Sequence, residues 1–190
     1  MQILGLSDST TKPEGSRIKA LFWPTIRHEY DADYICQQGF WVCSVLAVIT
    51  LGLGLLSGNV RTSLAFSVFA VYYFLGGIGV RQCSRFAATA VFVNYLLSIL
   101  GSGLAGIGVL SVITLALLLA NVRGTWLAAR WRAASTEPPP VRISQTLGDR
   151  ISNQLPPQVW PVGRWMFYVL AAMLTGLLVV GMVQFYAPAA

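Results

Sequence analysis

The sequence predicts an all-α membrane protein: a polytopic bundle of five transmembrane helices, with the N-terminus inside and the C-terminus outside, and a cytoplasmic interfacial amphipathic helix. Composition is the first reason. Hydrophobic residues make up 55% and charged residues 11% of the 190 residues, and a soluble domain of this length cannot bury so much apolar surface. Charge is the second reason. All 13 Lys and Arg residues except Arg61 fall on one side of the predicted spans, and positive loops stay in the cytoplasm.

Five apolar segments account for the predicted spans. The longest uncharged stretch, residues 86–121, would form a helix of about 54 Å, which is too long for a hydrocarbon core of about 30 Å. Gly101-Ser-Gly103 offers the turn at which it folds back. If this break were only a kink, the basic segment 123–164 would lie outside, against the charge distribution. The predicted spans are residues 39–57, 62–80, 86–101, 104–121 and 165–185.

Two predicted cytoplasmic regions and a short tail flank these spans. Residues 1–38 form an arm that opens without the features of a cleavable signal peptide, and Arg17–Pro24 fits either a short interfacial helix or a simple aromatic anchor. Residues 122–163 contain a proline spacer at 138–140 and an amphipathic helix over 141–155, bounded by prolines. Its apolar stripe either faces lipid or packs on the spans. Residues 186–190 form an external tail.

The cysteines are expected to be reduced structural thiols. Cys36, Cys43 and Cys83 all lie near the predicted inner face, where thiols stay reduced, so a disulfide framework is not expected. Cys36 and Cys43 share a helix face, but two thiols without a third ligand make a weak metal site.

Residue types that carry catalysis or bind cofactors are sparse. Ionisable side chains at membrane depth mark proton relays and coupled transport, and the five predicted spans contain none. The only histidine, His28, lies in the arm, which excludes haem held by two histidines of this chain. The spacing of His28 and its acidic neighbours matches neither a calcium loop nor a zinc helix. With no nucleophile elbow or catalytic carboxylate pair either, we expect neither an enzyme, nor a cofactor, nor a metal site.

Four polar residues form a candidate intramembrane cluster. Asn94 is the strongest polar group expected at membrane depth, and an amide facing lipid would lack partners. It is therefore expected to point to another helix or to a wet cavity. The cluster either makes hydrogen bonds within and between helices or lines a path for a substrate. Its members are Asn94, Ser98, Ser111 and Thr114.

The basic residues beside the spans predict contacts with anionic lipid headgroups on the cytoplasmic face, because Arg and Lys near a membrane surface are attracted to acidic phospholipids. No basic run belongs to a polar globular fold, so nucleic acid is not an expected partner. The candidate lipid contacts are Arg17, Lys19, Arg81, Arg85, Arg123, Arg130, Arg132, Arg142 and Arg150.

The leading functional hypothesis is a structural or accessory subunit of a bacterial inner membrane that packs with itself or with a larger membrane complex. Abundant glycines favour it, because small residues let membrane helices approach closely. Gly54 and Gly58 match a formal packing motif. The alternative is a channel or uncoupled carrier for a small neutral solute, with the polar cluster lining its path.

Overall fold

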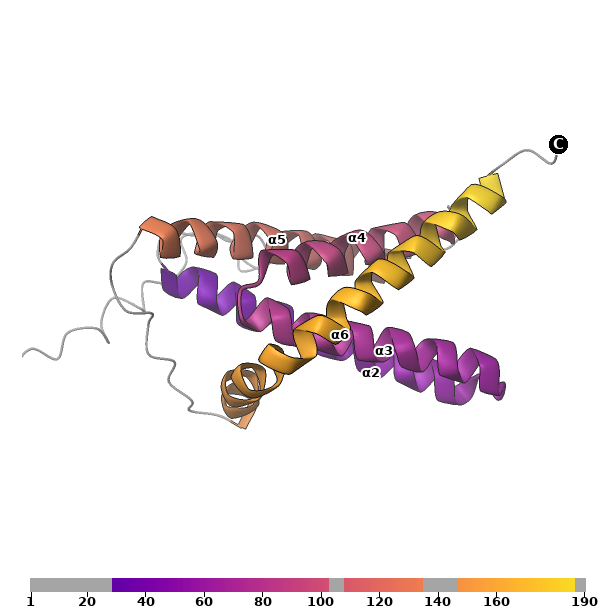
Figure 1. Cartoon of the computed structure of the whole chain (residues 1–190), viewed down its shortest axis with the longest axis horizontal. Helices are drawn as coiled ribbons and strands as arrows, with labels where there is room; N and C mark the ends of the chain where they lie inside the picture. The colour runs from indigo at the N-terminus through magenta and orange to yellow at the C-terminus, as the bar shows by residue number, and fades with distance from the viewer. Residues whose placement is uncertain (1–28, 103–107, 135–146, 187–190) are drawn as a thin grey trace, which may run out of the picture.

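The computed structural model describes residues 29–102, 108–134 and 147–186, and this part of the chain is entirely helical, without strands (Figure 1). The interfacial segment expected at 17–24, the proline spacer at 138–140 and the end of the tail lie outside the described residues. The five helices are α2 (Glu29–Leu56), α3 (Val60–Arg81), α4 (Arg85–Gly101), α5 (Val109–Ala134) and α6 (Leu147–Tyr186).

Helices α2 and α3 form a hairpin whose turn is built from small and polar residues. Gly58 has a φ of +64°, a conformation that glycine adopts without the strain of a side chain. The Asn59 side chain then accepts a hydrogen bond from the backbone N–H of Arg61 and caps α3, as expected of an N-cap residue. A Cβ added to Gly54 would lie 2.6 Å from the Phe66 Cβ, so α2 and α3 approach closely at this glycine. The two glycines of the formal motif therefore serve this hairpin.

The long uncharged stretch folds back as two helices. α4 ends at Gly101 and α5 begins at Val109, and the Trp126 indole nitrogen of α5 donates to the Thr89 hydroxyl of α4 over 3.4 Å. α2, α3, α5 and α6 are long and apolar enough to cross a membrane, whereas α4 is a shorter apolar helix of 17 residues. The fold is thus a bundle of apolar helices of the kind found in membrane proteins.

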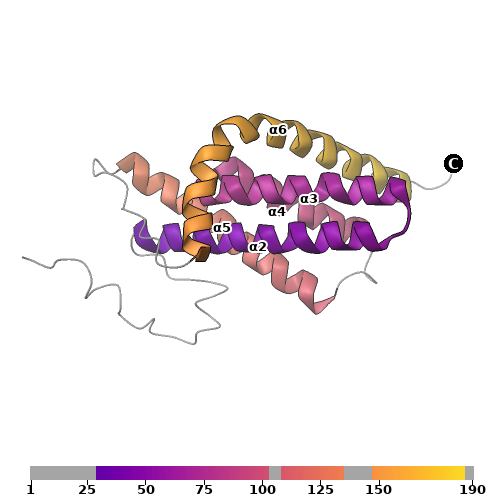
Figure 2. The same cartoon turned by 90° about the horizontal axis from the view of Figure 1, so that it is seen from below.

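Helix α6 differs from the prediction. Two separate elements were expected, an amphipathic helix ending near Pro156 and a span beginning at Trp165, but one continuous helix runs over both and contains Pro156, Pro157 and Pro161. Each proline lacks an N–H for the helical ladder, and prolines bend helices rather than always ending them. Figure 2 shows α6 bending sharply along its early part, and α6 packs against α3 and α4.

The core centres on α3, which packs against α2 on one side and against α4 and α6 on the other. Glycines allow these close approaches: a Cβ on Gly77 would lie 2.9 Å from the Cys43 Cβ of α2, and one on Gly79 would lie 2.6 Å from the Ala87 Cβ of α4. The rings of Tyr72 and Phe167 stack with centroids 5.2 Å apart. Tight packing of this kind holds the polar end of α3 in a fixed position.

Candidate functional site

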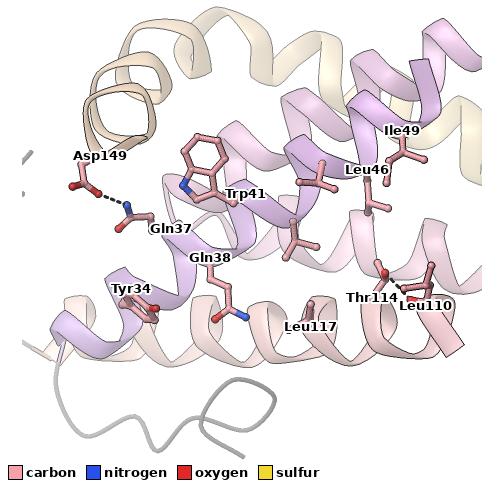
Figure 3. A pocket seen from close by; sticks show the side chains of 12 residues that line it. Tyr34, Gln37, Gln38, Trp41, Leu46, Ile49, Leu110, Thr114, Leu117 and Asp149 are labelled. Carbon is pink, nitrogen blue, oxygen red and sulfur yellow. Dashed lines mark hydrogen bonds between the residues drawn. The ribbon is translucent and has the colours of Figure 1, made fainter. Parts of the chain in front are cut away.

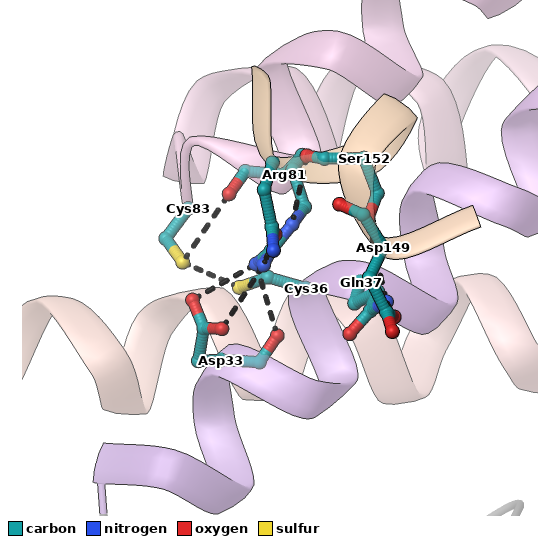
Figure 4. Close-up of polar contacts among 8 residues, drawn as sticks. Asp33, Cys36, Gln37, Arg81, Cys83, Asp149 and Ser152 are labelled. Carbon is teal, nitrogen blue, oxygen red and sulfur yellow. Dashed lines mark hydrogen bonds and ion pairs between the residues drawn. The ribbon is translucent and has the colours of Figure 1, made fainter. Parts of the chain in front are cut away.

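Polar side chains from three helices meet at one end of the bundle, in a cluster that we call the polar junction (Figure 4). α2 supplies two of them after its first turn, α3 supplies one at its last residue, and the first turns of α6 supply the remaining three. The junction consists of Asp33, Gln37, Arg81, Asp149, Ser152 and Asn153.

Arg81 is the centre of the junction and is 1% exposed. Its Nη1 and Nη2 donate to the two carboxylate oxygens of Asp33 over 2.8 and 3.1 Å. Nη1 also donates to the Asp33 carbonyl oxygen, Nη2 to Asn153 Oδ1 over 2.6 Å, and Nε to the Ser152 carbonyl oxygen over 3.1 Å. A guanidinium has five N–H donors, and these five hydrogen bonds use all of them.

This geometry corrects the expectation that Arg81 contacts lipid headgroups, because its side chain is buried and directed at protein acceptors. Arg85, also expected there, is exposed and lies over the Trp126 ring at 5.3 Å. Arg130 and Arg150 are exposed and Arg123 is half-buried, so these positions stay predicted headgroup contacts. The remaining candidates, Arg17, Lys19, Arg142 and the side chain of Arg132, lie outside the described residues.

The start of α6 turns its polar face toward the bundle. Gln37 Nε2 of α2 donates to Asp149 Oδ1 over 2.8 Å and to Ser152 Oγ over 3.3 Å, and Ser152 is fully buried. Leu147 and Ile151 belong to the predicted apolar stripe and are 77% and 50% exposed. These two residues face away from the bundle, whereas Leu155, which extends the stripe, packs against the core.

Two cysteines lie next to the junction. The sulfur atoms of Cys36 on α2 and Cys83 in the α3–α4 turn are 2.6 Å apart, and both cysteines are buried thiols. Cys83 has a φ of 53°, which is uncommon for a residue with a side chain. Cys36 and Cys43, which were predicted to share a helix face, do not form a site together, because Cys43 packs against Gly77 of α3. Among the described residues, no group of three or more His, Cys, Asp and Glu could hold a metal ion.

A lateral crevice of about 690 Å³ opens beside the junction, between α2 and α5 (Figure 3). Asp149, near the start of α6, lies at the polar end of the crevice. Helices α2 and α5 are in contact near that end, where a Cβ on Gly124 of α5 would lie 2.6 Å from a methyl group of Ile35 on α2. The lining residues are Tyr34, Gln37, Gln38, Trp41, Val42, Val45, Leu46, Ile49, Leu110, Thr114, Leu117 and Asp149.

The four members of the predicted polar cluster do not line this crevice together. Only Thr114 does, and its hydroxyl donates to the Leu110 carbonyl of its own helix over 2.8 Å. Ser98 bonds the Asn94 carbonyl in the same way, and Ser111 is half-buried near the start of α5. The Asn94 side chain is fully buried, and neither of its amide atoms has a hydrogen-bond partner among the described residues.

Sequence reasoning missed the polar junction and the crevice. Asp33 and Arg81 carry opposite charges at the same predicted membrane face, which was a usable signal, but the contribution of α6 depends on its bend.

No family model, curated protein or solved structure matches the chain. The described part of the chain is all-helical, and its apolar helices are compatible with a membrane location.

Proposed function

We propose that the chain is a structural or accessory membrane protein without enzymatic activity, and that it packs through α6 against a transmembrane helix of a second copy or of a larger membrane complex. It would lie in a bacterial inner membrane with its N-terminus in the cytoplasm. The observation that carries this proposal is a pair of small residues on the outward face of α6. Ala172 and Gly176 are both exposed, and a Cβ on Gly176 would meet nothing within 4 Å.

The two residues are four positions apart and therefore share a helix face. That face is opposite the buried face of α6, which presents Phe167, Ala171 and Leu174 to the core. Small residues four apart let membrane helices approach closely, and van der Waals packing then drives their association. The glycines of α3 already have such neighbours within the bundle, whereas Gly176 does not.

The rest of the molecule supports a non-catalytic role. At the centre of the polar junction, Arg81 directs its five N–H donors at Asp33, Ser152 and Asn153. Exposed arginines at the same end, including Arg130 and Arg150, support contact with anionic headgroups. The solute-carrier alternative has no comparable support, because Asn94, Ser98 and Ser111 are absent from the lining of the crevice.

A photo-cross-linking amino acid at position 176 tests the proposal in the native membrane. We expect a discrete protein adduct from position 176, the mass of which distinguishes a second copy from another subunit. Position 52 is the matched control: Gly52 is also open, but Val48 and Leu56, four residues away on either side, are 71% and 85% exposed and prevent close approach. Adducts with lipid alone at position 176 would refute the proposal.

Replacing Gly176 with Leu gives an independent measurement. The added side chain would separate two packed helices, so association measured by energy transfer in vesicles should fall by about fivefold or more, given that overpacking costs about 1 to 3 kcal/mol. Gly52→Leu adds the same apolar volume to the lipid face of α2 and should leave association unchanged.

A further inference from the structure

The crevice between α2 and α5 changes character along its length (Figure 3). Tyr34, Gln37, Gln38 and Asp149 line one end, where α6 reaches it. The wall then becomes apolar and remains so, apart from the Thr114 hydroxyl, which donates to its own helix. The apolar wall consists of Val42, Val45, Leu46, Ile49, Leu110 and Leu117. A site with a polar end and an apolar length fits an amphiphile aligned with the helices.

The length of the crevice matches one leaflet of a bilayer. From Tyr34 to Ile49, α2 rises about 22 Å at 1.5 Å per residue. Half of a hydrocarbon core of about 30 Å, together with one headgroup layer, is about 20 to 22 Å thick. Trp41 and Tyr34, which line the crevice on its polar side, are residue types that favour the boundary between headgroups and acyl chains.

Charge selects the headgroup. Among the described residues that line the crevice, Asp149 carries the only formal charge, and its carboxylate accepts a hydrogen bond from the Gln37 amide. A carboxylate attracts ammonium groups and repels phosphate, and a hydrogen bond between them is strengthened by charge. Arg81 is not among the residues that line the crevice, and its guanidinium forms an ion pair with Asp33.

We propose that this crevice binds one phospholipid whose headgroup carries a primary amine, with the ammonium group at Asp149 and Gln37 and an acyl chain along the apolar wall. A transmembrane helix is a poorer occupant, because its surface at the polar end would have to offer a cation to Asp149. The lipid would hold α2 and α5 at the distance that the crevice sets. This site uses α2 and α5, so it does not depend on association through α6.

Native mass spectrometry of the full chain tests this site. The protein is reconstituted into nanodiscs of equal parts phosphatidylethanolamine, phosphatidylcholine and phosphatidylglycerol, then released into mild detergent. We expect one retained phosphatidylethanolamine per chain, favoured over phosphatidylcholine by about tenfold to a hundredfold, the effect of one charge-assisted hydrogen bond. No retained lipid, or a preference for phosphatidylglycerol, would overturn the proposal.

Three variants separate the contributions. Asp149→Asn removes the charge but keeps a hydrogen-bond acceptor for Gln37, so the headgroup preference should disappear while lipid is still retained. Leu117→Trp narrows the crevice at the middle of its apolar wall and should weaken the retention of lipid of every class. Leu119→Trp is its control, because Leu119 is exposed on α5 outside the crevice, and it should retain lipid as the unmodified chain does. If Leu117→Trp does not fold, Asp149→Asn decides: an unchanged preference rejects the site.

Discussion

Arg81 at the end of α3 and Asp33 near the start of α2 form a bidentate ion pair of 2.8 and 3.1 Å, in which Arg81 is 1% and Asp33 19% exposed. The pair joins the open ends of the α2–α3 hairpin, opposite its turn. Because Arg81 also binds Ser152 and Asn153, the same guanidinium attaches α6 to that hairpin.

Arg81→Leu should therefore destabilise the protein strongly. Removing one partner of a buried ion pair leaves the other without its countercharge, at a cost of about 3 to 5 kcal/mol. Because Asp33 is partly exposed, we expect the lower end of this range, measured by reversible unfolding in mixed micelles. Arg61→Leu is the control: Arg61 is exposed at the other end of α3, and its loss should change stability by about 0.5 kcal/mol or less. Equal effects of the two substitutions would contradict the buried pair.

A mild oxidant should link Cys36 to Cys83 and leave Cys43 free. The first two sulfur atoms lie 2.6 Å apart, whereas Cys43 packs between α2 and α3. Intact-mass measurement should show the loss of two hydrogen atoms per chain, and peptide mapping should place the bond. Cys43→Ala should not alter the product. Cys83→Ser should abolish it, and a link that involves Cys43 would mean that α2 packs differently.

Gly79→Val should disrupt the packing of α3 against α4 and α6. The added Cβ would contact the Trp160 ring and lie 2.6 Å from the Ala87 Cβ, and overpacking of this kind costs about 1 to 3 kcal/mol. Gly52→Val is the matched control, because its Cβ meets nothing within 4 Å. The difference between the two unfolding free energies measures how tightly these helices pack. A difference near zero would show that α3 does not lie against α4 and α6.

Asn94→Leu should leave stability unchanged or raise it. The Asn94 amide is buried without a hydrogen-bond partner among the described residues, and an unpaired buried polar group costs about 1 to 3 kcal/mol. Tyr72→Phe provides a parallel measurement, because the Tyr72 hydroxyl is buried in the same state. A loss of more than about 1 kcal/mol in Asn94→Leu, of the size of a net hydrogen bond, would reveal a partner such as bound water.

Labelling of single cysteines tests the proposed orientation. In a chain with its three cysteines replaced by alanine, Asn59→Cys in the α2–α3 turn should react with an impermeant maleimide in intact cells. Ala133→Cys near the end of α5 should react only after permeabilisation. Asn59 and Ala133 are both exposed, so access across the membrane sets the difference. The reverse pattern would place the N-terminus outside.

Sequence patterns predicted the helical class and the places where the chain turns back, because apolar runs and glycine turns are local signals. The break after Gly101 is an example, since the length of the uncharged stretch required it. The burial of Arg81 could not be predicted in the same way, because an arginine at the end of an apolar run usually marks the membrane surface. Its acceptors Ser152 and Asn153 come from distant sequence, and the prolines that bend α6 were expected to end a helix.

The distance along the chain between Arg81 and its partners has a consequence for biosynthesis. Asp33 and Arg81 can pair as soon as α3 leaves the ribosome, but the Ser152 carbonyl is made 71 residues later. Until then the guanidinium has only part of its set of acceptors. A chain truncated before α6 would expose a half-satisfied cation at the bundle end, a feature by which quality-control proteases could distinguish it from a finished chain.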